Sequence, residues 1–177
     1  GPLGEAVKAK YAIIGNTAVI EMAQASGLFL VPDDSRDPMI TTTYGTGELI
    51  RHAVDMGVNK VILAVGGSAT NDGGVGMAQA LGARFTDTEG KELGYGCRDI
   101  GKVSAVDLSL MQKLLVDTEV ILASDVSNIL CGPEGASHVY GPQKGADQET
   151  VDIMDHNLAR LAEVLKDTTG VDAGAMP

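Results

Sequence analysis

Residues 58–74, VNKVILAVGGSATNDGG, decide the fold class because they join an apolar run to a glycine-rich loop. The run Val58–Val65 is rich in β-branched residues and is bounded by glycines, which predicts a buried, parallel strand. The loop follows at once, and a short helix is expected from Gly73 to Leu81. This order of strand, loop and helix is typical of α/β proteins, which bind ligands at the carboxyl edge of the sheet.

Hydrophobic spacing on both sides of this stretch predicts the other elements. Alternation around Gly15-Asn16 predicts a β-hairpin from Tyr11 to Met22, and a second hairpin is expected from Ala83 to Leu93. A second buried strand is expected from Val120 to Ala123. The predicted helices are 47–56, with Thr46 as its N-cap, 108–115 and 148–167. The fold class is therefore α/β, with a mixed sheet, covering helices and β-hairpins.

Composition restricts the classes of function. The chain has 177 residues, of which 44% are hydrophobic and 21% charged, so it fits one globular domain. A net charge of −11, no Lys/Arg run and only 3% aromatic residues argue against binding to nucleic acid or anionic membranes. No apolar run reaches the roughly 18 residues of a membrane span. The only cysteines, Cys97 and Cys131, suit neither a disulfide framework nor a zinc site, which favours a reducing, cytoplasmic compartment.

Both ends of the sequence suggest a piece of a longer protein. The chain starts with Gly1-Pro2-Leu3-Gly4 and not with Met. Its last residues, 172–177, resemble a segment that has been cut in its middle. We therefore expect that residues 1–177 were taken from a longer chain.

The glycine-rich loop offers the groups that an anion site needs. Glycines such as Gly67 let backbone amides approach an anion closely, and Ser68, Thr70 and Asn71 add side-chain donors. Asp72 would repel a bare anion, but its carboxylate suits Mg²⁺ or a substrate hydroxyl. Spacing alone allows a second interpretation, in which the loop is a tight turn and Asn71 or Asp72 caps the next helix.

Two later segments carry further candidates. Asp125 directly follows the second predicted strand, where it could hold Mg²⁺ or act as a base, and Asn128 lies in the same loop; either could instead close its own turn. The Pro/Gly-rich segment 132–145 offers Ser137 and Lys144. Lys144 could contact a phosphate as a point charge, although a solvated lysine is the more common outcome on such a loop.

Several segments together resemble one family. Residues 65–82, VGGSATNDGGVGMAQALG, resemble the signature of the bacterial glycerate kinases, which phosphorylate D-glycerate. Residues 20–28 (IEMAQASGL), 41–49 (TTTYGTGEL) and 132–146 (GPEGASHVYGPQKGA) resemble other segments of the same family in the same order. The similarity covers essentially the whole chain. One departure is Ile129, which stands where the family usually has a proline.

The resemblance implies a domain organisation and a reaction. The family's enzymes are two-domain α/β kinases of about twice this length, and residues 1–177 resemble their inserted domain, so we expect the other domain to be absent. The implied reaction is the transfer of a phosphoryl group from ATP to D-glycerate with Mg²⁺. The alternative is a non-catalytic module that binds glycerate or another anion but cannot transfer phosphate alone.

The resemblance also suggests a role for each candidate residue. Asp72 and Asp125 are the expected catalytic residues or Mg²⁺ ligands. The expected substrate- or phosphate-binding residues are Gly67, Ser68, Thr70, Asn71, Asn128, Ser137 and Lys144. The expected partners are the small-molecule substrate and the missing domain, with no nucleic acid and no membrane.

Overall fold

The main sheet has four strands in the order β1-β2-β3-β6. The structure, a computed structural model, describes residues 1–175. The strands are β1 (Ala12–Ile14), β2 (Thr17–Glu21), β3 (Lys60–Ala64) and β6 (Glu119–Ala123). β1 is antiparallel to β2, whereas β2, β3 and β6 are parallel, so the sheet is mixed. The first hairpin and the parallel strand of the glycine-rich motif are therefore confirmed, and so is the α/β class.

Helices surround one face and the carboxyl end of this sheet. They are α1 (Ala23–Ser26), α2 (Tyr44–Asp55), α3 (Val75–Ala80), α4 (Cys97–Ile100), α5 (Ser109–Leu114), α6 (Ala136–Tyr140) and α7 (Gln148–Thr169). Short 3₁₀ turns occupy Leu28–Leu30, Asp33–Ser35, Pro142–Lys144 and Ala173–Ala175. In the described part of the chain, no helix is both long enough and apolar enough to cross a membrane.

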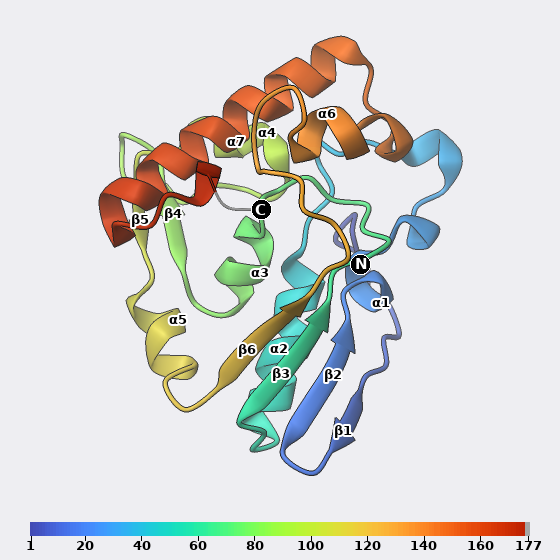
Figure 1. Cartoon of the computed structure of the whole chain (residues 1–177), viewed down its shortest axis with the longest axis vertical. Coiled ribbons are helices and arrows are strands. Elements are labelled where there is room, and N and C mark those ends of the chain that lie inside the picture. The colour runs from blue at the N-terminus through green and yellow to red at the C-terminus, as the bar shows by residue number, and fades with distance from the viewer. Residues whose placement is uncertain (176–177) are drawn as a thin grey trace.

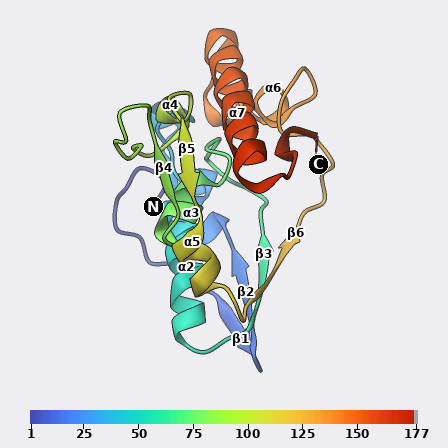
Figure 2. The ribbon, with the colours of Figure 1, turned by 90° about the vertical axis from the view of Figure 1, so that its left-hand side faces the viewer.

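Among the described residues, two large hydrophobic cores hold these layers together, and a smaller one lies at the start of α7. One large core lies between the sheet and α2, where Ile20 and Leu63 pack against Ile50. The other large core lies under α7, where Leu158 and Leu161 pack with residues of the segment between α3 and β5. Figure 1 shows the strands β2, β3 and β6 running toward α6 and α7, and Figure 2 shows α2, α3 and α5 on one side of the sheet and no helix on the other. The carboxyl edge of the sheet thus meets the second core.

The second buried strand was predicted wrongly in one respect. β6 forms as expected, but all five of its residues are exposed, and Leu122 is 62% exposed. The reason is its position, because β6 pairs with β3 on one side only and forms the edge of the sheet. Its apolar side chains are therefore typical of a strand that another part of a protein covers, and residues 1–175 leave them exposed.

Two further local predictions also differ from the structure. The second predicted hairpin forms in part: the chain turns between Asp87 and Lys91 and returns antiparallel, with an isolated bridge between Thr86 and Glu92, but the regular strand partner of β4 (Arg84–Thr86) is β5 (Ala105–Asp107). Helix α2 begins at Tyr44, three residues before the predicted start, with Thr43 as its N-cap position. The predicted cap, Thr46, is instead fully buried within the helix.

Candidate active site

The glycine-rich loop leaves the carboxyl end of β3 and leads into α3. Two backbone hydrogen bonds hold it against the end of α1 and the residues that follow: Ala69 N donates to Ser26 O at 2.9 Å, and Leu28 N donates to Gly67 O at 2.8 Å. Gly67 has a φ of +72°, a left-handed conformation that side chains other than glycine rarely adopt. The loop is thus a fixed platform at the edge of the sheet.

Lys144 reaches this loop from a segment far away in sequence. Its Nζ donates to Ser68 Oγ at 2.9 Å and to Thr70 O at 2.6 Å, and the residue is only 7% exposed. Burial lowers the pKa of Lys144 to about 8, although the nearby Asp72 charge acts to raise it. The structure therefore brings the first and third candidate segments together, and Lys144 is not the solvated lysine that such a loop usually carries.

Asp72 lies behind the loop and is 1% exposed. Its Oδ2 accepts from Thr43 N and Thr43 Oγ1, both at 2.8 Å, and from Gly76 N at 3.3 Å. Its Oδ1 accepts from Gly74 N at 3.1 Å. Burial raises the pKa of Asp72, although these hydrogen bonds act to lower it. The carboxylate of Asp72 thus links the starts of α2 and α3. These contacts agree better with the interpretation of a tight turn and helix cap than with an open metal ligand.

Neighbouring amides fix the surrounding loops. Asn71 Nδ2 donates to Ser137 Oγ at 2.9 Å, which ties the glycine-rich loop to α6. Asn128 lies between two partners, because Tyr140 donates its hydroxyl to Asn128 Oδ1 at 2.6 Å and Asn128 Nδ2 donates to Glu134 O at 2.9 Å. Asn71, Asn128 and Ser137 therefore use their side chains for internal contacts in this structure.

Two cavities meet at Ser68 and Lys144. The first, of about 320 Å³, is mostly apolar and is lined by leucines together with Thr70, Asn71 and Asp72. The second, of about 340 Å³, is lined by Gly67 and Asp125, and also by Tyr140 and Gln143, which sequence reasoning did not single out. Neither cavity is lined by Asn128 or Ser137. Tyr140 and Gln143 could have been noticed, since both stand in the same Pro/Gly-rich segment as Lys144.

Asp125 is the exposed carboxylate of this region. It follows β6 at the carboxyl edge of the sheet and lines the same cavity as Ser68 and Lys144. Within residues 1–175, no three His, Cys, Asp or Glu side chains gather closely enough to form a metal site by themselves. Mg²⁺ in phosphoryl-transfer sites is commonly held by one or two carboxylates and the substrate's own phosphates, and Asp125 fits that requirement.

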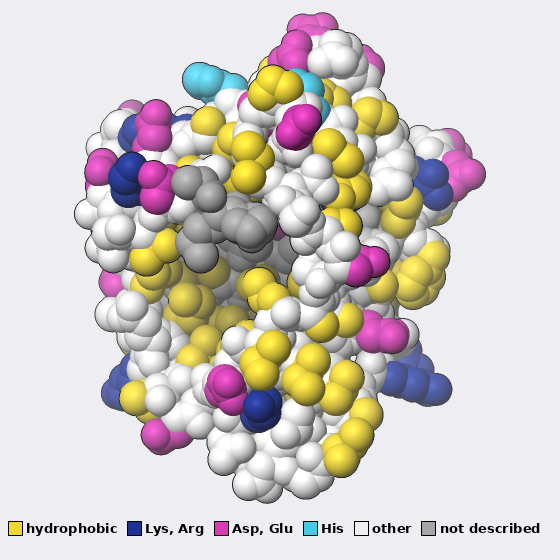
Figure 3. Space-filling model, in the orientation of Figure 1, with side chains coloured by type: hydrophobic (Ala, Val, Ile, Leu, Met, Phe, Trp, Pro, Cys, Tyr) yellow, Lys and Arg dark blue, Asp and Glu magenta, His cyan; other side chains and the backbone are white. Residues whose placement is uncertain are grey.

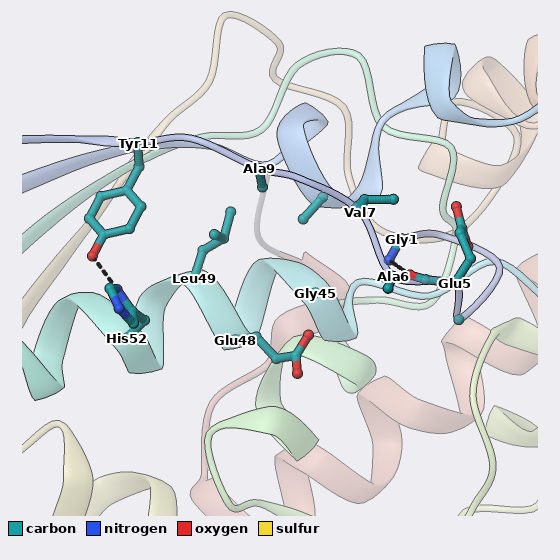
Figure 4. A pocket seen from close by; sticks show the side chains of 12 residues that line it. Gly1, Glu5, Ala6, Val7, Ala9, Tyr11, Gly45, Glu48, Leu49 and His52 are labelled. Carbon is teal, nitrogen blue, oxygen red and sulfur yellow. Dashed lines mark hydrogen bonds between the residues drawn. The ribbon is translucent and has the colours of Figure 1, made fainter.

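A larger cavity, of about 610 Å³, lies elsewhere, between the N-terminal segment and α2. Figure 4 shows Leu49 of α2 pointing toward that segment and Tyr11 meeting His52, whose Nδ1 lies 2.6 Å from the tyrosine oxygen. None of the candidate site residues lines this cavity. Size alone therefore does not identify the functional site.

A sequence model of the glycerate kinase family matches residues 1–177. The chain belongs to the glycerate kinase family. A glycerate 2-kinase from Escherichia coli (strain K12) is 48% identical over 179 residues, which cover 100% of this chain and 47% of the relative. A glycerate kinase from Bacillus subtilis (strain 168) is 49% identical, with coverage of 96% of this chain and 45% of the relative.

A solved structure agrees with these glycerate kinase sequences. A crystal structure from Salmonella typhimurium LT2, of a protein assigned as glycerate kinase 2, is 48% identical and superposes with a TM-score of 0.96. The match covers 99% of this chain and 48% of that one. The chain thus spans about half the length of the glycerate kinases it matches, and its candidate site lies within the matched half.

Proposed function

We propose that this chain is the part of a glycerate kinase that binds D-glycerate and the transferred phosphoryl group, in the ATP-dependent conversion of D-glycerate to phosphoglycerate. Polypeptide beyond residues 1–177 would complete the enzyme, in line with the chain's coverage of about 47% of its relatives. The observation that carries the proposal is the buried ammonium of Lys144, held by Ser68 and Thr70 where two cavities meet. The free cysteines of the protein, Cys97 and Cys131, agree with a cytoplasmic location.

Lys144 supplies the positive charge that an anion needs in an acidic protein. The net charge is −11, so the protein as a whole repels glycerate and phosphate. An ammonium group has three N–H donors, and Ser68 and Thr70 occupy two of them, which leaves one for a carboxylate or phosphoryl oxygen. Desolvation strengthens this contact because the interaction of charges grows as the local dielectric constant falls. Gly67 and Ser68 add donors on the side of Asp125, and Thr70 adds one on the other side, where Asn71 holds the loop to Ser137.

The two carboxylates have different roles in this proposal. Asp125 is exposed in the cavity of Lys144, so it holds Mg²⁺ or accepts the proton of the glycerate hydroxyl. Bound Mg²⁺ would neutralise the charge of the phosphate oxygens. Asp72, whose oxygens already accept four hydrogen bonds, positions the loop from behind. The expectation that Asp72 itself binds Mg²⁺ or a proton stays a prediction, and its substitution by asparagine in a family-length enzyme tests it.

Binding of D-glycerate to the 177-residue chain tests the role of Lys144. We expect Lys144→Met to weaken binding at least tenfold in calorimetry, because a charged hydrogen bond is lost, whereas the exposed Lys113→Met should bind like the unmodified chain. The affinity should also fall as the pH rises through about 8, where Lys144 loses its proton. Equal affinity in both variants, or a pH-independent affinity, would contradict the proposal.

The alternative function is a binding module that cannot transfer phosphate. The half-length coverage favours it for the isolated chain. A mixture of the chain with ATP, Mg²⁺ and D-glycerate distinguishes the two, because release of ADP that depends on glycerate excludes the module. Glycerate binding without ADP release supports it, and then Asp125→Asn in a family-length enzyme decides whether Asp125 serves the reaction.

A further inference from the structure

Strand β6 forms one edge of the main sheet, and its sequence is unusual for that place. Edge strands in natural proteins commonly carry charged side chains or proline, which keep other strands from pairing with them. The only charged residue of β6 is Glu119, at its start, and this side chain is paired with Lys60 of β3 at 3.1 Å. The rest of the strand reads VILA. β6 thus lacks the residues that protect an open edge.

Both faces of β6 are apolar. Val120 and Leu122 lie in register with two buried residues of β3, and Ile121, between them, faces the opposite side of the sheet. A continuous apolar run is typical of a parallel strand inside a covered sheet. Yet Val120 is 40% exposed and Leu122 is 62% exposed. The side chains of β6 therefore suit an interior strand better than an edge.

The backbone of β6 also has an open side. The amide of Glu119 donates at 2.9 Å to the residue before β3, and the carbonyl of Ala123 accepts at 3.3 Å from the residue after β3. Backbone groups alternate in direction along a strand, so those of Ile121 also face β3, whereas those of Val120 and Leu122 point away from it. Within the described part of the chain, no strand pairs with that side. Such a row of free N–H and C=O groups is a template for one more strand.

The open edge leads directly to the candidate site. Asp125 follows β6 closely and lines the cavity of Ser68 and Lys144. The strands β2, β3 and β6 are all parallel, which favours a parallel partner on the open side. A parallel strand would end at the same edge of the sheet, so the residues that follow it would lie next to Asp125.

The matched glycerate kinases contain polypeptide that can fill this place. The chain covers 47% of the relative from Escherichia coli and 48% of the solved structure. We propose that one extended, apolar segment of the remaining half pairs with the open edge of β6 as a fifth strand, parallel to it, and brings its carboxyl end beside Asp125. The pairing follows from the edge itself, whereas its benefit for phosphoryl transfer rests on the proposed role of Asp125.

Amide hydrogen exchange tests the pairing residue by residue. In the 177-residue chain, the amides of Val120 and Leu122 should exchange fast, and those of Ile121 and Ala123 should be protected by β3. In a family-length enzyme that carries this sequence, exchange at Val120 and Leu122 should be slower by about tenfold or more. Equal rates in the two proteins would overturn the proposal. Protection in the isolated chain that grows with its concentration would also overturn it, because a second copy would then occupy the edge.

A matched pair of proline variants tests the pairing through stability. Proline lacks the amide N–H, so a strand tolerates it where that N–H faces solvent and not where it bonds to a neighbour. In the isolated chain, Val120→Pro should keep a urea midpoint close to that of the unmodified chain, whereas Ile121→Pro should lower it clearly. In the family-length enzyme, both variants should lower the midpoint. An unchanged midpoint for Val120→Pro in that enzyme would show that its edge is open there too.

Photocrosslinking in the family-length enzyme tests the direction of the fifth strand. A benzoylphenylalanine in place of Glu119 and, in a second protein, one in place of Asp125 should both react with the same segment outside residues 1–177. The product from position 125 should lie later in that segment, as a parallel strand requires. The reverse order, or products only within residues 1–177, would refute the proposal. None of these measurements needs glycerate or ATP, so an enzyme without phosphoryl transfer would contradict the proposed function and not the fifth strand.

Discussion

Lys144 links the stability of the protein to pH. In the unfolded chain its pKa has the ordinary value of 10.5, whereas burial lowers it to about 8 in the folded protein. Between these pH values the unfolded state binds more protons at Lys144, so the contribution of Lys144 to the free energy of unfolding should rise as pH increases from about 8 to 10.5. Each pKa unit corresponds to about 1.4 kcal/mol, so a shift from 10.5 to about 8 gives a rise of about 3.5 kcal/mol. Urea unfolding at several pH values should show this increment as a growing difference between the unmodified chain and Lys144→Met; parallel profiles would contradict it.

Asp72 should matter for stability, unlike Asp125. Asp72→Asn places an NH₂ group where a carboxylate oxygen now accepts from backbone amides, because both of its oxygens face donors. We expect a loss of about 1–3 kcal/mol in the free energy of unfolding, the typical cost of an unsatisfied buried group. Asp125→Asn, at an exposed position, should change it by less than about 0.5 kcal/mol. Comparable values for the two variants in urea titrations would show that Asp72 does not position the loop.

At the scale of elements, Gly47 sets how closely α2 and α3 pack. A Cβ at Gly47 would lie 2.7 Å from Ala80 Cβ and would collide with Met77 O. Alanine is the better helix former by about 1 kcal/mol, but overpacking costs about 1–3 kcal/mol. We therefore expect Gly47→Ala to lower the midpoint of thermal unfolding, whereas Glu48→Ala, one residue away and exposed, should leave it nearly unchanged. A stabilised Gly47→Ala would show that the helices can move apart freely.

The start of α2 shows where prediction from the sequence ends. Glycines at positions 45 and 47 are poor helix formers, so the predicted start falls too late. In the structure, Asp72, which is 29 residues away, accepts from the backbone amide of Thr43 and from its hydroxyl. Because this acceptor is distant in sequence, the residues around the start of α2 give no signal of it. By contrast, the strand and loop of residues 58–74 were predictable because their pattern is contiguous, and α7 because its apolar spacing is regular.

In the candidate site, too, some features could be predicted from the sequence and others could not. The glycine-rich loop and Asp125 could be named from sequence, since each directly follows an apolar strand. The contact of Lys144 with Ser68 joins residues 76 positions apart, and from spacing alone a solvated lysine was the better interpretation. The burial of Lys144 depends on how the segment around α6 packs against the glycine-rich loop. Hydrophobic periodicity in the sequence does not predict that packing.

At the scale of the whole molecule, residues 1–175 leave one face of the sheet uncovered by helices. Neighbouring strands place Val19, Ile62 and Ile121 side by side, and Figure 3 shows hydrophobic side chains gathered over this part of the surface. Parallel strands in known proteins are normally covered on both faces. Because the chain spans about half of its relatives, we infer that polypeptide from the remaining half covers this face in a family-length enzyme.

The uncovered face gives a prediction for the isolated chain. Ile121 is 36% exposed, so Ile121→Lys should change the free energy of unfolding by less than about 1 kcal/mol. Leu63→Ala, on the neighbouring strand but 1% exposed, should cost about 2–5 kcal/mol. Ile121→Lys should also reduce self-association in sedimentation experiments and the binding of a hydrophobic dye, because a charge interrupts the apolar row. If Ile121→Lys instead destabilised the chain as much as Leu63→Ala, β6 would be buried by residues 1–177 themselves, and the uncovered face would need no second half.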